Sequence, residues 1–286
     1  ALAVSQSWTA VYRNQWRTFL SGQLTSPKTD NTILRGGPSM KTPGQLYLSA
    51  SIDSDWRKKL SGDLNFTYYG TFNDIKSNYN LSFELEYKPF NTLTLNLEPS
   101  WSTTMNRMQY VTRRTLAGDP QENRYIFGTI NQKIYSISIR ADYNITPDLT
   151  IQYWGQPFFG SGSYREFKRI TDPRAASMDD RYEILGSGQI AYAIRDRLYS
   201  IDENLDSSVD YTFGNPNFTV SEFLHNFVIR WEFLPGSTAF LVWSQNRDYY
   251  TGSGMFNVSR QSQDLFRKAK PYNIFLIKFS YRFGLH

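Results

Sequence analysis

The side chains that most often carry catalysis or bind transition metals are scarce in this sequence. It has no cysteine and only two histidines, His225 and His286, so thiolate chemistry is excluded and a histidine–cysteine metal site is disfavoured. His225 shares one face of a predicted strand with Phe223 and Phe227, and no serine–histidine–acid arrangement can be read around it. We interpret His225 as a side chain near lipid, and we predict a protein that is not an enzyme and uses no metal and no cofactor.

Charged side chains instead recur at alternate positions of several predicted strands. Because successive strand side chains point to opposite faces, residues two positions apart share a face. The charged set is Glu84, Glu86, Glu98, Arg140, Asp142, Glu222, Arg230, Glu232, Lys278 and Arg282. In a barrel this face would line the lumen, where mutual ion pairing is the favoured interpretation and a charged constriction that selects solutes is the alternative. Glu84 and Glu86 also have the spacing of an acid–base pair, but that spacing is common by chance.

Two predicted loops have compositions that suit ion binding. Four acids could bind calcium, although they lack the spacing of an EF-hand, and solvated loop acids are the simpler interpretation. These acids are Asp202, Glu203, Asp206 and Asp210. Residues 35–38 (RGGP) could form an anion-binding nest of backbone amides. A loop that needs the backbone freedom of Gly36 and Gly37 is the favoured interpretation.

The strands that must position these side chains are marked by period-two alternation. The clearest example is residues 79–88, where one face reads Tyr-Leu-Phe-Leu-Tyr and the other is polar. Tyrosines at both ends of an apolar strip are typical of a strand that faces lipid between two membrane interfaces. The last predicted strand, residues 273–283, alternates in the same way. Its apolar face carries Phe275, Ile277, Phe279, Tyr281 and Phe283.

The spacing of strands and turns predicts the fold class. No stretch approaches the ~18 consecutive apolar residues of a membrane helix. Short turns, at residues 55–58, 88–91, 146–148 and 234–237, alternate with mostly longer connections. We predict an all-β, antiparallel transmembrane β-barrel with about 10 to 12 visible strands, either closed by this chain or part of a larger barrel. A soluble β-sandwich or lipocalin-like barrel is the alternative, and it requires the face of Phe275 and Phe279 to be buried.

Residues 158–217 interrupt this rhythm within what we predict to be a single domain over residues 1–286. About sixty residues without a strand pattern is long for a loop, and long loops are usually functional or disordered. The segment is rich in tyrosine and arginine, whereas disorder predicts few aromatic residues. We therefore expect an ordered extracellular or plug-like loop.

Composition limits the partners. The net charge of +5 comes from 31 basic and 26 acidic residues spread along the chain, which does not favour nucleic acid. The 20 tyrosines and 7 tryptophans suit membrane interfaces, where the ring is apolar and the polar tip stays hydrated. The first twelve residues lack the features of a signal peptide and begin in an alternating pattern. The sequence is therefore either a mature protein or part of a longer one, and we favour the second interpretation.

Four stretches together resemble a known domain family. They are residues 35–38 (RGGP), 214–218 (GNPNF), 230–237 (RWEFLPGS) followed by 242–245 (VWSQ), and 275–281 (FLIKFSY). They resemble the C-terminal outer-membrane β-barrel domain of unknown function that follows a family 9-like carbohydrate-binding domain in Gram-negative bacteria, most clearly over residues 205–286. The resemblance implies a location in the bacterial outer membrane, contact with its lipid, and recognition of the last strand by the barrel assembly machinery. It implies no activity.

These observations lead to a functional prediction with two alternatives. We predict a non-enzymatic, porin-like outer-membrane barrel that acts as a pore or transporter, or as a membrane anchor for a surface or periplasmic domain. The first alternative is a structural subunit that binds other subunits of a larger outer-membrane complex. The second is a barrel enzyme that acts on lipid or glycan, which the missing nucleophile–histidine pair disfavours.

Overall fold

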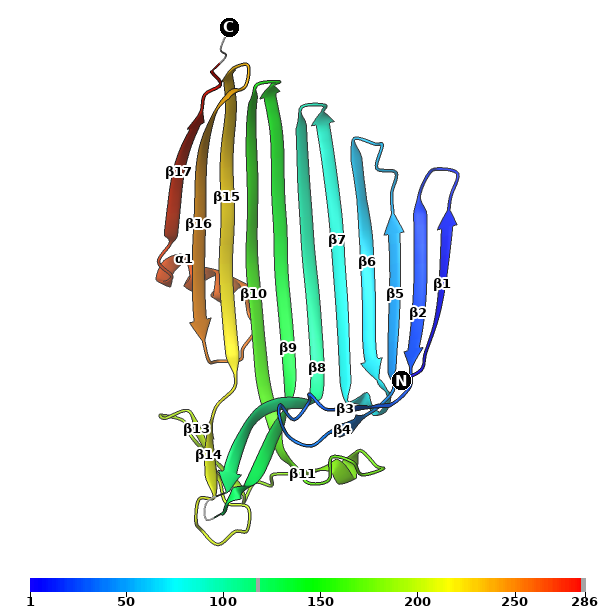
Figure 1. Cartoon of the computed structure of the whole chain (residues 1–286), viewed down its shortest axis with the longest axis vertical. Coiled ribbons are helices and arrows are strands. Elements are labelled where there is room, and N and C mark those ends of the chain that lie inside the picture. The colour runs from blue at the N-terminus through cyan, green and yellow to red at the C-terminus, as the bar shows by residue number, and fades with distance from the viewer. Residues whose placement is uncertain (117–118, 284–286) are drawn as a thin grey trace.

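One large antiparallel sheet dominates the computed structural model, which describes residues 1–116 and 119–283 (Figure 1). Its strands are β1 (Ala3–Val11), β2 (Arg17–Thr25), β5 (Gln45–Asp53), β6 (Leu60–Thr71), β7 (Lys76–Phe90), β8 (Leu93–Leu116), β9 (Asp119–Thr146), β10 (Leu149–Ile170), β15 (Phe218–Leu234), β16 (Ser237–Thr251) and β17 (Tyr272–Ser280). They follow one another in this order across the sheet. The prediction of an all-β, antiparallel architecture is confirmed.

The sheet is not closed into a barrel. Within the described residues β1 pairs only with β2 and β17 only with β16, and the two strands lie at opposite sides of the sheet (Figure 1). The first two strands, β1 and β2, form a hairpin. With the short strand β11 (Tyr182–Ile184), which pairs with the end of β10, the sheet has 12 strands.

Smaller elements gather at the end of the sheet that carries the long connections (Figure 1). They are the hairpin β3 (Lys28–Asp30) and β4 (Met40–Thr42), the 3₁₀ turns η1 (Phe72–Asp74) and η2 (Asp179–Arg181), and a three-stranded sheet of β12 (Ile190–Ala193), β13 (Leu198–Ile201) and β14 (Tyr211–Gly214). Here a buried apolar cluster forms around Ile126, Phe167 and Phe213. We call the ordered region from residue 171 to 217 the cap.

The exposure of the two faces of the main sheet is the reverse of that in a soluble protein, because the apolar face is exposed and the polar face is half-buried. Along β7, Leu81 and Phe83 are exposed, whereas Ser82, Glu84 and Glu86 on the other face are half-buried. Phe83 is 39% exposed and Phe279 on β17 is 74% exposed. The face that carries the aliphatic and aromatic rows therefore lacks a covering layer over most of the sheet, whereas a soluble sheet buries that face.

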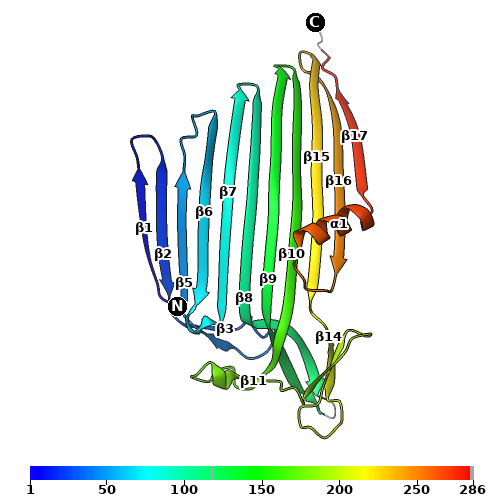
Figure 2. The same cartoon turned by 180° about the vertical axis from the view of Figure 1, so that it is seen from behind.

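One helix, α1 (Val258–Lys268), lies across the strands on the apolar face, where Figure 2 shows it in front of β15 and β16. Asn257 caps it, because its side chain accepts a hydrogen bond of 2.9 Å from the Arg260 amide. Its side chains Gln261 and Leu265 are buried. None of the helices in the described part of the chain is long and apolar enough to cross a membrane.

Three boundaries differ from the sequence predictions. The strand β10 continues from Phe158 to Ile170, so the long connection begins at residue 171, and Gly160 and Gly162 explain why the strand pattern could not be read. Residues 249–270, for which the sequence predicts neither a strand nor a helix, contain the end of β16 and α1. The last strand ends at Ser280 rather than Phe283. Its final pair joins Ser280 to Thr238, one residue from the start of β16 at Ser237, so little of β16 remains for further pairing.

Candidate functional site

Four carboxylates line up across neighbouring strands on the polar face. Asp53 on β5 lies opposite Asp63 on β6, and Asp63 lies opposite Glu84 on β7. The register of β7 and β8 extends this row to Glu98. Directly opposed like charges destabilise a sheet, so this acidic row is an arrangement that folding stability alone does not favour.

The acidic row is only partly neutralised. At one end Arg17 Nε lies 3.0 Å from Asp53 Oδ2. Asp63 accepts a 2.7 Å hydrogen bond from the neutral amide of Asn65. Glu84 and Glu98 form no ion pair within the described residues. The two predicted residues thus belong to a larger row whose other members, Asp53 and Asp63, sequence reasoning missed.

Most other predicted lumen-facing charges pair along their own strands. The Arg140–Asp142 and Arg230–Glu232 pairs are each 2.7 Å apart, and Glu86 pairs with Lys88 at 2.6 Å. All of these residues lie on the polar face with Glu84. Each pair neutralises two opposite charges within one strand.

The remaining members of the charged set lie at the last three long strands. Glu222 is half-buried on the polar face of β15, opposite Asp248. Lys278 is exposed on β17, opposite Phe240. Arg282 follows the end of β17, where its backbone amide donates to Ser237 Oγ at 3.1 Å. Tyr281 and Phe283 also lie beyond β17, so only the first part of the predicted C-terminal stripe belongs to the sheet.

A second concentration of charge lies in the cap. The Glu203 side chain is 7% exposed and its carboxylate accepts hydrogen bonds from Arg124, Arg169 and Tyr211. The Arg124 Nε atom is 2.9 Å away and the Tyr211 hydroxyl 2.7 Å. Burial raises the pKa of that hydroxyl, which keeps it protonated as a donor.

The acids considered as calcium ligands fold the turn that contains them. Asp210 accepts from the Glu203 amide at 2.7 Å, and Asp202 accepts from the Ser207 amide at 2.8 Å. The Ser208 amide lowers the pKa of Asp206 by bonding its carboxylate. In the described ranges, no three acidic or histidine side chains are placed to hold one metal ion. Asp202, Asp206 and Asp210 therefore stabilise the local turn, whereas the Glu203 carboxylate accepts from Arg124, Arg169 and Tyr211.

The remaining candidates from the sequence are the two histidines and the loop of residues 35–38. His225 is buried on the apolar face among aromatic rings, with its ring centroid 4.5 Å from that of Trp243 and 6.0 Å from that of Tyr153. His286 lies outside the described residues. In the loop of residues 35–38, Gly36 has a φ of +100°, and a side chain at Gly37 would collide with the ring of Tyr125. The loop thus needs glycine, as the favoured interpretation predicted.

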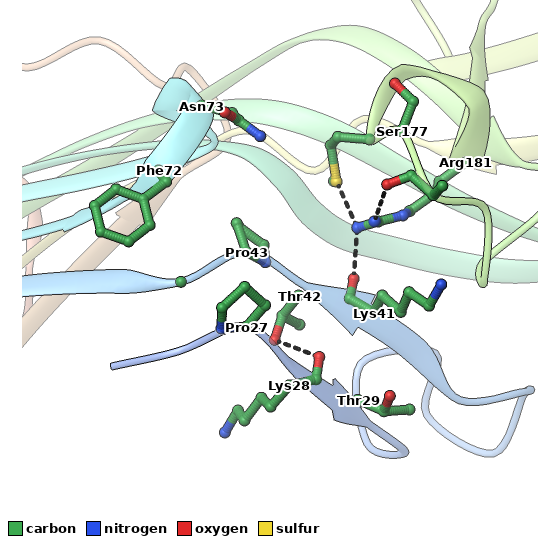
Figure 3. Close-up of a pocket in the computed structure, with 13 residues that line it drawn as sticks. Pro27, Lys28, Thr29, Lys41, Thr42, Pro43, Phe72, Asn73, Ser177 and Arg181 are labelled. Atoms are coloured by element: carbon green, nitrogen blue, oxygen red, sulfur yellow. Dashed lines mark hydrogen bonds between the residues drawn. The ribbon is translucent and has the colours of Figure 1, made fainter. Parts of the chain in front are cut away.

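A pocket of about 590 Å³ lies between the β3–β4 hairpin, η1 and the start of the cap (Figure 3). Its lining includes three basic residues, Lys28, Lys41 and Arg181, and no acidic residue. Arg181 is 6% exposed, and its guanidinium donates to the backbone carbonyls of Lys41 at 2.8 Å and Ala175 at 2.9 Å. Sequence reasoning missed this pocket because Arg181 is 140 positions from Lys41, and neither segment has a binding motif.

Comparisons with known proteins give one structural likeness and one family. A match among solved structures is a structure titled "NanC porin structure in rhombohedral crystal form", 11% identical, which covers 98% of this chain and 93% of that chain with a TM-score of 0.25. No curated protein matches the chain. A family model described as "Domain of unknown function (DUF5916)" matches residues 3–283. The chain is therefore a member of the DUF5916 family.

Proposed function

We propose that this chain forms the wall of a non-enzymatic transmembrane β-barrel in the bacterial outer membrane, and that its polar face lines a path for solutes. One observation carries the proposal: the apolar face of the main sheet is exposed while the polar face is half-buried. Contiguous apolar surface of this extent requires a covering layer. Lipid supplies that layer in a barrel, with the polar face turned inward.

The height of the apolar band supports a membrane span. One boundary row contains Leu93, Tyr143, Ile151 and Ile229, next to the short turns, and another begins with Trp101 and Tyr135. Leu93 and Trp101 are eight positions apart on β8, about 26 Å along an extended strand. The nine residues from Leu93 to Trp101 match the ~9–11 residues that a tilted strand needs to cross a membrane. The next row of the same face is polar, with Thr103 opposite Lys133.

A barrel in lipid also requires partners for the free edges of β1 and β17. An unpaired amide or carbonyl in hydrocarbon costs several kcal/mol, so an open sheet cannot remain there. We propose that these edges pair with each other or with additional strands. We further propose that the alternating residues of β17, Phe275, Ile277 and Phe279, are the stretch that the assembly machinery recognises.

The position of the cap suggests how the mouth of the barrel is covered. The cap lies at the end with the long connections, and Arg114 on β8 donates to the carbonyl of Thr212 on β14 at 2.7 Å. We propose that this end faces outward and that the cap partly covers the opening. The four-residue turn between β15 and β16 marks the opposite, periplasmic end.

The proposal is tested by membrane insertion and conductance. The protein should fractionate with outer membranes, resist extraction without detergent, and migrate differently on gels before and after boiling. In planar bilayers it should produce discrete current steps. Recovery of a folded, detergent-free soluble protein would contradict the barrel, and a folded membrane form without current would contradict the solute path.

The acidic row predicts a preference for cations. Replacing Glu84 and Glu98 together by glutamine should shift the reversal potential in a salt gradient towards the value of a non-selective pore, because the row attracts cations in the lumen. The matched control replaces Glu122 and Glu183, two acids at the cap end, by glutamine. Both double variants then have the same net charge. The difference should shrink near 1 M salt, where the screening length is about 3 Å. Equal reversal potentials for both variants would contradict this role.

A further inference from the structure

We propose that the pocket lined by Lys28, Lys41 and Arg181 binds a small organic anion whose phosphate or sulfate group faces the basic side chains. The inference concerns soluble ligands at the cap end, and it does not depend on whether the polar face conducts solutes. It follows from the charge, hydrogen-bonding groups and shape of the pocket.

The first argument is an uncompensated buried charge. Arg181 is 6% exposed, yet its guanidinium has no carboxylate within ion-pair distance among the described residues. Its partners are three backbone carbonyls, of Lys41, Ala175 and Ala176, and the sulfur of Met178. These four neutral contacts use most of the five guanidinium N–H groups but leave the positive charge in place. A buried cation without a counter-ion raises the local affinity for an anion.

The second argument is the composition of the lining. Lys28 and Lys41 add two ammonium groups from neighbouring strands, and Thr29 and Ser177 add hydroxyl donors. The Thr42 hydroxyl donates to the Lys28 carbonyl. The nearest carboxylate contact of these lysines is weak, since Lys28 Nζ lies 4.0 Å from Asp30 Oδ2. The lining thus offers ammonium and hydroxyl donors and no carboxylate. Phosphate and sulfate oxygens are acceptors that suit such donors.

The third argument is the apolar wall opposite the charge. Phe72 is 49% exposed, and in Figure 3 its ring lies on the side of the pocket away from Arg181, near Pro27 and Pro43. A volume of about 590 Å³ exceeds the needs of a bare oxyanion and falls within the range of small-molecule sites. A ligand with an anionic group and a body that can lie against a ring, such as a sugar phosphate, uses both sides of the pocket.

The test is calorimetric titration of the detergent-solubilised protein with glucose 6-phosphate, glucose and inorganic phosphate. We expect glucose 6-phosphate to bind, inorganic phosphate to bind more weakly, and glucose not to bind. The informative variant is K28Q/K41Q, because both side chains are at the surface and neither holds Arg181 through its ammonium group. Its affinity for glucose 6-phosphate should fall by at least about tenfold.

The matched control is K58Q/K59Q, which removes the same charge from the short turn between β5 and β6 at the far end of the sheet. Its affinity should equal that of the unmodified protein, since a charge beyond the screening length contributes little. Equal losses in the two variants would show a general charge effect and overturn the site. So would equal binding of glucose, or no binding of either phosphate at about 10 mM. If the protein forms a pore but does not bind glucose 6-phosphate, the anion-site proposal fails and the barrel proposal is unaffected.

Discussion

Replacing Phe83 by arginine should destabilise the membrane-embedded protein by about 2–4 kcal/mol, whereas arginine at the adjacent Ser82 should cost far less. Phe83 lies near the middle of the apolar face of β7, opposite Leu64 on β6. If that face contacts lipid, the guanidinium must enter hydrocarbon or distort the bilayer around it. Ser82 faces the other way, two positions from Glu84 on the same face of β7, so a guanidinium there shares a face with a carboxylate that has no ion pair within the described residues.

The measurement is reversible unfolding in phospholipid vesicles, followed by the change in gel mobility between folded and unfolded forms. The pair of variants shares the same new side chain and differs only in the face that receives it. A soluble arrangement with the apolar face buried also penalises arginine at position 83, but it predicts a detergent-free folded protein. Equal destabilisation at positions 82 and 83 would contradict the assignment of the two faces.

Removing the Glu203 carboxylate by substitution with alanine should destabilise the cap by about 1–3 kcal/mol, because the half-buried Arg124 and Arg169 lose their shared buried acceptor and keep only the more exposed Glu122 and Glu183. The Glu203 side chain is only 7% exposed, and its loss also leaves the Tyr211 hydroxyl without its hydrogen-bond acceptor. The effect should be local, since the ion cluster lies beyond the end of the membrane-sized apolar band. Hydrogen exchange of β13 and β14 should accelerate while the melting of the main sheet stays the same.

Glu183 supplies the control for this prediction. It pairs with Arg169 at 2.7 Å, but its side chain is 46% exposed, so substitution with alanine should cost less than about 1 kcal/mol. If the two alanine variants exchange hydrogens equally fast, Glu203 does not hold the cap together.

The main sheet could be predicted from the sequence wherever one face was continuously apolar. In β7 the alternation of Leu81, Phe83 and Leu85 with polar residues fixes both the strand and its two faces. The strand over residues 158–170 was not predicted, because Gly160 and Gly162 have no side chain that would mark a face. The helix α1 was missed because one of its two buried side chains is the polar Gln261, which removes the apolar repeat that identifies a short helix.

The candidate sites could not be predicted in full from the sequence for a different reason, because they depend on contacts between distant segments. The sequence places Glu84 and Glu98 on one face, but their alignment with Asp53 and Asp63 depends on strand register, which is set by turns and pairing across the sheet. The basic pocket depends on long-range docking of residues 173–181 against the β3–β4 hairpin, as in the bond from the Lys41 amide to the Pro173 carbonyl. No local pattern contains that information.

The helix α1 and the residues before it have a mechanical consequence for the sheet. Antiparallel ladders repeat every two residues, so neighbouring strands can slide past each other by that step and regain their hydrogen bonds. Phe256 rests against Trp101 on β8, with ring centroids 5.2 Å apart, and Gln261 bonds the carbonyls of Gly160 on β10 and Val220 on β15. The segment from Phe256 to Gln261 thus contacts three strands, β8, β10 and β15, at fixed positions. A slip of any of them would break these contacts, so α1 acts as a brace against shear in a sheet that has no disulfide to lock it.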